Sequence, residues 1–443
     1  MIKYILNNRL LFIGIHILMG YVSTLLKGSI ILKLFWVLII GFFIFIITFK
    51  KNKNEEALYL ASYLVGAEVF IRMSDGFLLY ETGKYAIILF SLLGIIWGPV
   101  KQKTSISFLV YVLFLLIGIV FTQVPLGESL RKSIAFNLSG PISLGFFALY
   151  CYKRTITILQ LKELLFVCLL PVFSIISFVY FRTPDLEELV FNGSSNFSTS
   201  GGFGPNQVAT IIGFGVFILS VFIFTRVQLS LSIFLDIIFL LYFTYRGLLT
   251  FSRGGMITAI FAFFIFVLFM LFYQKNTFIK VFKFLFITLI LFLGIWLYTS
   301  DITGGMIDNR YANKNASGIE KKDISAGRFQ LFSAQLENFY ESPILGIGVG
   351  NGKYKRIESG KRITAASHNE ITRFIEEHGL LGILALLILL IKPLQNIYFS
   401  TNYQRAFLLS FYVFWFLTIN HSAMRIAFPA FVYGLSLIKI DHE

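Results

Sequence analysis

The sequence has little of the charge that keeps a soluble domain in water. Only 14% of its 443 residues are charged, whereas soluble domains have about 25%. It has only two cysteines, Cys151 and Cys168, which lie at or inside hydrophobic segments without the spacing of a metal site. A disulfide framework and a zinc site are therefore not expected. The Asp and Glu residues form no cluster that suggests a metal, and we expect no cofactor.

Hydrophobic residues make up 57% of the chain and aromatic residues 17%. Apolar stretches of eighteen or more residues recur along it, and each is long enough to cross about 30 Å of hydrocarbon as a helix. These stretches are continuous rather than alternating, which favours helices over the strands of a barrel. The sequence therefore predicts an all-α polytopic membrane protein without a soluble domain of the usual size.

We expect about 12–14 transmembrane helices and count fourteen candidate spans. The spans lie near residues 10–26, 31–49, 57–73, 84–98, 106–122, 133–151, 163–181, 207–225, 230–249, 256–273, 278–299, 380–397, 406–422 and 426–440.

The formal net charge is +15, which in a soluble protein would suggest nucleic acid. Here Lys and Arg gather at the ends of the hydrophobic runs, as at residues 50–53 and 153–154, so they indicate membrane orientation and no nucleic-acid partner. The alternation of basic loops places both termini in the cytoplasm. On the opposite, extracytoplasmic face, two polar stretches stand out, at about 182–206 and 300–379.

These features divide the chain into four parts. The predicted parts are N-terminal transmembrane helices (1–181), central transmembrane helices (182–299), a large extracytoplasmic loop (300–379) and C-terminal transmembrane helices (380–443).

The long loop contains two predicted helices. The first covers Ser325–Glu341 and carries its apolar residues on one stripe. The second begins at Ser367, which forms the capping-box pattern with Glu370, and ends at Gly379. His368 would then be the first residue of that helix.

Two arginines could hold an anion. Arg253, in the run FSRGG, lies near membrane depth, and Gly254 and Gly255 would let the backbone turn there and expose amide N–H groups. The alternative is an arginine that extends to the membrane surface. Arg328, in SAGRFQLF, opens the first loop helix, although a single loop arginine is most often a solvated charge.

A histidine could move a proton. The positive end of a helix disfavours a cation, so the imidazole of His368 should be neutral and able to accept a proton from a sugar hydroxyl. An exposed histidine at a helix start has little weight alone. His421, in INHSAMR near the outer face, is the other histidine of interest.

Four motifs appear in the order of a known family. They are GGFGPNQVA, FSRGG, GRFQLFSAQLENFYESPILGIGVG and SHNEITRFIEEHGLLG, the last with a His-Asn pair, nine spacers, Gly, two spacers and Gly. From about residue 190 to 390 the chain resembles the O-antigen ligase and polymerase family. The resemblance implies a glycosyltransferase C-like fold and a metal-independent enzyme that moves a glycan off a polyprenyl-diphosphate carrier.

The resemblance also assigns roles to residues. Arg253 and Arg328 would bind the diphosphate, and His368 would activate the acceptor hydroxyl. Asn206 and Asn369 match further motif positions and would help to bind substrate.

The implied partners are an undecaprenyl-diphosphate-linked glycan donor, membrane lipid, and an acceptor that is lipid A-core, a polysaccharide or a protein. The implied location is the bacterial inner membrane, with the active site on the extracytoplasmic side. The alternative function is a polyprenyl-linked-sugar flippase or another polysaccharide transporter. A flippase should carry charge along many spans and often has repeated halves, whereas here charge gathers in one outer loop and we find no repeat.

Overall fold

A computed structural model describes residues 6–98, 104–189, 191, 194–273, 278–321, 327–360 and 367–441. The described part is almost entirely helical, with two three-residue strands. The elements are α2 (Arg9–Leu25), α3 (Ile30–Lys50), α4 (Glu56–Met73), α5 (Thr82–Ile96), α6 (Ile106–Val120), α7 (Leu130–Cys151), β1 (Thr155–Thr157), α8 (Ile158–Arg182), α9 (Pro205–Phe224), α10 (Ile233–Leu249), α11 (Arg253–Tyr273), α12 (Phe278–Ile302), α13 (Met306–Tyr311), α14 (Arg328–Glu341), α15 (Gly352–Glu358), α16 (Glu370–Tyr398), α17 (Asn402–His421), α18 (Phe428–Leu435) and β2 (Lys439–Asp441), with short 3-10 turns at Leu186–Glu188 and Ser198–Ser200.

Every predicted span except the last coincides with one helix of at least 15 residues. Seven of the described helices are long and apolar enough to cross a membrane, and three more are apolar but shorter. The chain is thus an all-α polytopic membrane protein. Hydrophobic length predicts the helices well because a backbone in lipid must satisfy its hydrogen bonds within the segment.

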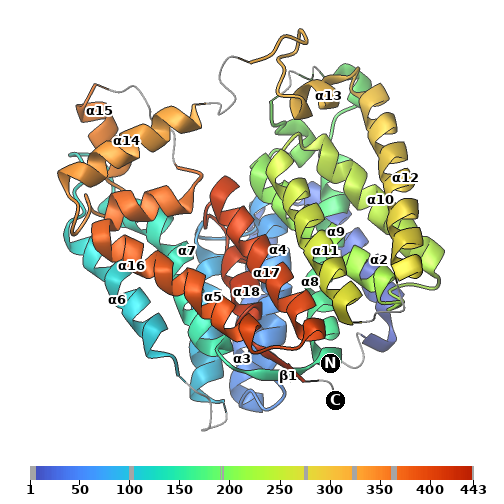
Figure 1. The fold of residues 1–443 in the computed structure, drawn as a ribbon, viewed down its shortest axis with the longest axis horizontal. Helices are drawn as coiled ribbons and strands as arrows, with labels where there is room; N and C mark the ends of the chain where they lie inside the picture. Colours follow the sequence, from blue (N-terminus) through green and yellow to red (C-terminus); the bar gives the residue numbers. More distant parts are fainter. Residues whose placement is uncertain are drawn as a thin grey trace.

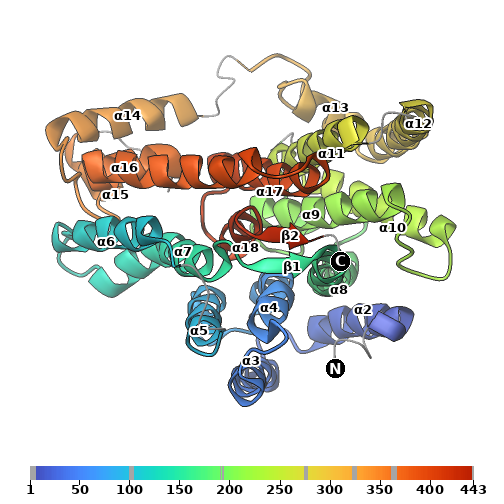
Figure 2. The same ribbon diagram turned by 60° about the horizontal axis from the view of Figure 1, so that its bottom comes forward.

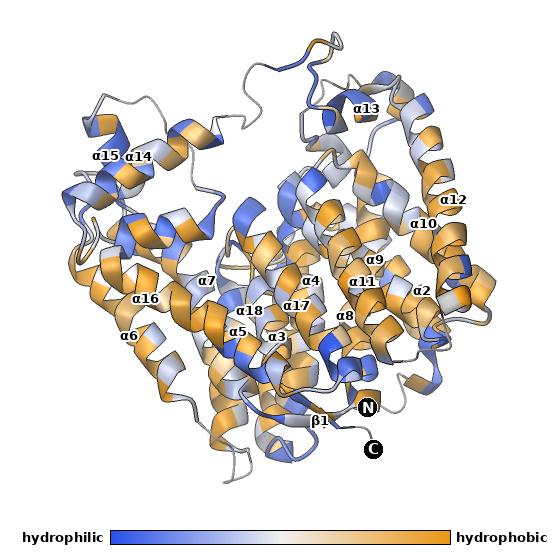
Figure 3. Cartoon of the chain, viewed as in Figure 1, coloured by the Kyte–Doolittle hydropathy of each residue, from blue (hydrophilic) through white to orange (hydrophobic). Residues whose placement is uncertain are grey.

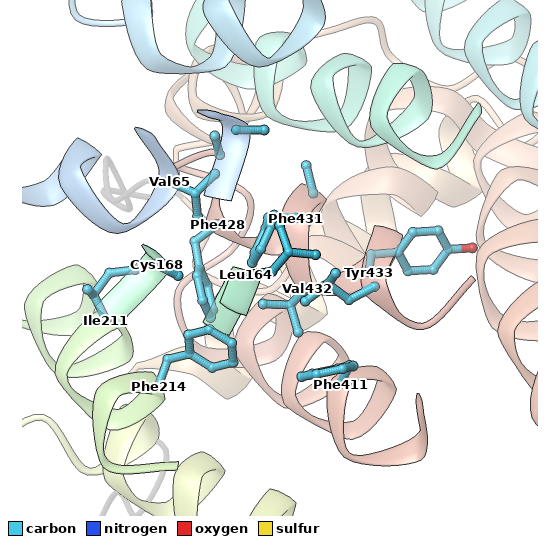
Figure 4. Packing of buried hydrophobic residues seen from close by; sticks show 14 of the residues in the cluster. Val65, Leu164, Cys168, Ile211, Phe214, Phe411, Phe428, Phe431, Val432 and Tyr433 are labelled. Carbon is cyan, nitrogen blue, oxygen red and sulfur yellow. The ribbon is translucent and has the colours of Figure 1, made fainter. Parts of the chain in front are cut away.

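The last predicted span, 426–440, is wrong in detail. Only the eight residues of α18 are helical, a buried turn precedes them, and strand β2 follows. In Figure 4, Phe428, Phe431 and Val432 of α18 lie among core side chains of other helices. Irregular backbone at membrane depth is tolerated where protein covers it. Hydropathy alone cannot distinguish such a protein-covered segment from one that faces lipid.

The helices pack in layers (Figure 2). Helix α8 packs against α2, α4 and α9, and α11 packs against both α9 and α17. Apolar side chains on α3 and α12 point outward, including Leu38, Phe49, Phe282 and Leu297. These two helices therefore carry surface that suits lipid.

The bundle has two distinct ends. Strands β1 and β2 pair in parallel, with Thr155 opposite Lys439, so the loop before α8 and the C-terminal segment share one end. Helices α13, α14 and α15 lie at the opposite end (Figure 1), where hydrophilic residues gather (Figure 3). This arrangement fits the predicted placement of residues 153–154 and the C-terminus on one side of the membrane.

Candidate functional site

The predicted site residues come from separate helices and converge at the end that carries α13–α15. Asn206 lies in the first turn of α9, and Arg253 and Arg328 are the first residues of α11 and α14. His368 and Asn369 immediately precede α16.

The turn before Arg253 is held in an uncommon conformation. Phe251 has a φ of 55°, which costs about 1–2 kcal/mol for a residue with a side chain. Its ring stacks on Phe191 with centroids 5.1 Å apart. The next residue, Ser252, donates a hydrogen bond from Oγ to Oδ1 of Asn206 at 2.8 Å. Asn206 therefore fixes the segment from which Arg253 extends.

The two glycines after Arg253 do not form the predicted turn, since both lie inside α11. A Cβ on Gly255 would come within 2.3 Å of the carbonyl of Ala209, and one on Gly254 within 2.4 Å of the ring of His421. The glycines instead allow α11 to approach α9 and α17 closely.

His421 is buried at the centre of this convergence. Its Nδ1 lies 2.8 Å from the Leu417 carbonyl and its Nε2 lies 3.2 Å from Oγ1 of Thr210. The preceding residue, Asn420, accepts a hydrogen bond from Nδ2 of Asn369 at 3.1 Å. His421 thus has partners for both ring nitrogens, and the end of α17 joins the RGG and His-Asn motifs.

Three arginines form a cluster on one side of this centre. Nη1 of Arg253 donates to the carbonyl of Arg310 at 3.1 Å, and Nε of Arg310 donates to the carbonyl of Phe251 at 2.9 Å. Desolvation, followed by repulsion from Arg253, lowers the pKa of Arg328. The pKa of Arg310 is lowered by desolvation and by both other arginines.

No carboxylate of the described residues forms an ion pair with Arg253 or Arg328. Guanidinium groups that repel one another and lack an acidic partner make a site for an anion, and their planar forks suit phosphate oxygens. Arg310, which the sequence did not single out, extends this site from α13.

The predicted cap of α16 is wrong. The helix begins at Glu370, and the capping side chain is Asn369, whose Oδ1 accepts from the N–H groups of Ile371 and Thr372. Ser367 instead hydrogen-bonds the backbone of Asn369. His368 therefore precedes the cap and is not the first residue of the helix.

His368 remains a candidate base for a different reason. Its side chain is exposed at the surface, yet partial desolvation, followed by the charges of Arg425 and Arg328, lowers its pKa below the ordinary value. Desolvation and two neighbouring cations therefore favour the neutral imidazole, rather than the helix end that the sequence suggested. Arg425 is buried, and its Nη2 donates to the carbonyl of Ser367 at 3.0 Å.

A buried carboxylate positions the loop helix that carries Arg328. Glu376 on α16 accepts hydrogen bonds from Gln335 at 2.8 Å and Asn338 at 2.7 Å, both on α14, and pairs with Arg356 of α15 at 3.1 Å. The predicted helix is confirmed over Arg328–Glu341; its first residues, 325 and 326, lie outside the described part. Its polar face is the buried one, and its aromatic residues are largely exposed.

The glycine-containing segments 343–348 and 377–380 pack against each other. Gly379 has a φ of 59° and interrupts α16, as its position in the sequence predicts for a helix end. The N–H of Leu380 then reaches the Pro343 carbonyl at 2.8 Å, and the N–H of Gly348 reaches the Glu377 carbonyl at 3.1 Å. A Cβ on Gly346 would come within 2.4 Å of Glu377. These backbone hydrogen bonds and close contacts therefore hold the loop against α16.

Comparison with known families agrees with these motifs. Residues 237–387 match the family model described as O-antigen ligase. The matched segment contains Arg253, Arg328, His368 and Asn369, whereas Asn206 precedes it. A search of curated proteins found no match to the chain.

Proposed function

We propose that the chain, of which residues 237–387 match the family model described as O-antigen ligase, transfers a glycan from undecaprenyl diphosphate to an acceptor hydroxyl. The observation that carries this proposal is the convergence of the motif residues at one end of a membrane bundle. There, Arg253 and Arg328, which form no ion pair with a carboxylate of the described residues, lie beside a histidine whose pKa is lowered. An anionic leaving group and an acceptor that must lose a proton require this combination.

Arg253 and Arg328 bind the diphosphate, and Arg310 adds a third positive charge. The negative charge on the diphosphate grows as its bond to the sugar breaks. Cations fixed in advance stabilise that charge in the transition state without reorganising.

His368 acts on the acceptor. Its neutral imidazole takes the proton from the acceptor hydroxyl as the oxygen forms a bond to the anomeric carbon. The bond from that carbon to the diphosphate oxygen breaks, and the electron pair leaves with the diphosphate. Asn369 caps α16 and bonds Asn420, which keeps the residue beside His368 in place.

The first test separates charge from geometry at Arg253. Arg253→Ala should lose almost all transfer to an acceptor, and Arg253→Lys should keep a small part, since a point charge remains without the planar fork. Transfer is measured with purified protein and a lipid-linked donor. The control is Arg182→Ala, an exposed arginine at the end of α8 on the same face. Full activity of Arg253→Ala would reject the diphosphate site.

The proposed site faces the extracytoplasmic side of the bacterial inner membrane, with both termini in the cytoplasm. Cysteines that replace the exposed Ser317 and Ser359 should react with an impermeant maleimide in spheroplasts, whereas a cysteine at Lys53 should not. The native Cys151 and Cys168 are buried and give little background. Labelling at Lys53 would overturn the orientation.

The acceptor class is read from a deletion strain. Loss of polymer from lipid A with intact carrier-linked chains identifies a ligase, and single repeat units identify a polymerase. Unchanged lipopolysaccharide with loss of glycan from a protein identifies a protein glycosyltransferase.

A further inference from the structure

A cavity of about 590 Å³ opens at the same end of the bundle as the candidate site. Its walls come from the start of α5, the α6–α7 loop, α7, α15 and α16. Ser367 and Arg425 line it, and these are the two residues that join it to His368. None of the three clustered arginines, on α11, α13 and α14, lines it. The cavity is thus separate from the arginine cluster, and Ser367 and Arg425 connect it to His368.

Two of the buried arginines that line the cavity are paired with carboxylates. Arg356 pairs with Glu376 at 3.1 Å, and Arg373 pairs with Glu377 at 2.6 Å. Arg425 is also buried and instead donates hydrogen bonds to two carbonyls and an amide oxygen.

The rim has an excess of positive charge. Arg131, Lys132 and Lys353 are exposed and form no ion pair with a described residue. The rim carboxylate is Glu128, which accepts a hydrogen bond from the hydroxyl of Tyr354. Three cations face one acid, so an anionic ligand suits the opening better than a neutral one.

We propose, on the basis of the proposed function, that this cavity binds the acceptor, and that the acceptor is a glycan whose sugars carry negative charge. The acceptor hydroxyl must reach the base without displacing the diphosphate. Ser367, next to His368 in the chain, lines the cavity, whereas none of the clustered arginines does, so an acceptor in the cavity places its hydroxyl beside the base and leaves the diphosphate site open. The volume lies within the range of about 300–1,000 Å³ that is usual for ligand pockets.

The test uses the full-length protein in nanodiscs and two probes. One probe is trigalacturonate, an acidic trisaccharide, and the other is its fully methyl-esterified and therefore neutral form. Binding is followed by saturation-transfer NMR. The test variant is Lys353→Glu, and the matched control is Lys355→Glu, which lies on the same short helix but does not line the cavity.

The wild type should bind trigalacturonate more tightly than its ester. Lys353→Glu should weaken binding of the acid by about tenfold, and Lys355→Glu should leave it unchanged. Equal binding of the two probes, equal effects of the two variants, or no binding to the wild type would each overturn the acceptor proposal.

A second measurement separates this proposal from the proposed function. Undecaprenyl diphosphate binding should be weakened by Arg253→Ala and unaffected by Lys353→Glu. If the diphosphate binds in this way while trigalacturonate does not, only the acceptor proposal fails. If Arg253→Ala leaves diphosphate binding unchanged, the proposed function fails.

Discussion

Two groups of arginines lie at the same end of the molecule and have opposite surroundings. Arg356 and Arg373 are buried and pair with glutamates of α16. Arg253 and Arg328 are at least partly exposed and have no such partner among the described residues. The first group brings α14, α15 and α16 together, whereas the second leaves its charge available to the anion of the proposed function. The type of residue is the same, and its surroundings distinguish a structural arginine from a candidate for substrate binding.

The largest expected difference is between Arg373 and Arg253. Arg373→Ala leaves Glu370 and Glu377 buried without a cation, which should destabilise the protein by about 3–5 kcal/mol. Arg253→Ala removes a charge that repels its neighbours, so the melting temperature in detergent should stay near that of the wild type. Melting curves of the two purified variants make the comparison. Equal losses of stability would show that the unpaired arginines are also structural.

The sequence predicts the fold and the arginines that pair with glutamates better than it predicts the candidate site. Arg373 lies three residues after Glu370 and four before Glu377, so both pairs follow from helical spacing. Hydrophobic length likewise locates the long helices. Each of these signals is local, and local signals are visible in one sequence.

What the sequence could not predict depends on contacts between distant segments. The charge of Arg425 lowers the pKa of His368, and the same side chain donates to the carbonyl of Ser367, 58 positions earlier in the chain. Arg310 enters the site because it bonds the carbonyl of Phe251, 59 positions away. The incorrect cap at Ser367 is a related case, since Asn369, which caps the helix instead, also donates to Asn420 of α17, a contact that local sequence does not indicate. The motifs of the resembled family identified residues that the fold brings to one end of the bundle, and the geometry added their neighbours.

The next effect concerns His368, whose neighbouring charges are Arg425 and Arg328. His368→Ala should lower the rate of transfer by about 10²–10⁴. The melting temperature should hardly change, because Asn369 caps α16 without the imidazole. Donor binding should also survive, since the arginines hold the diphosphate. A transfer assay is paired with a melting curve and a donor-binding assay. Loss of donor binding together with transfer would show that His368 holds the substrate instead of taking the proton.

The smallest expected effect is a shift in the pH dependence of transfer. It measures how bound donor changes the influence of Arg328 on the pKa of His368. A protonated imidazole cannot accept a proton, so activity falls on the acid side of the pKa of His368. In the free enzyme this pKa lies below the ordinary value of about 6.5, and the acid limb of kcat/KM for the donor should therefore lie below pH 6.5. Bound diphosphate offsets the positive charge of Arg328, so the limb of kcat, which reports the complex, should lie at higher pH. The kcat/KM profile for the donor is recorded at a low acceptor concentration, so that it reports the free enzyme, and the kcat profile at saturating donor and acceptor; His368→Ala is the control that should lack the limb. Coincident limbs would mean that the diphosphate does not bind beside His368.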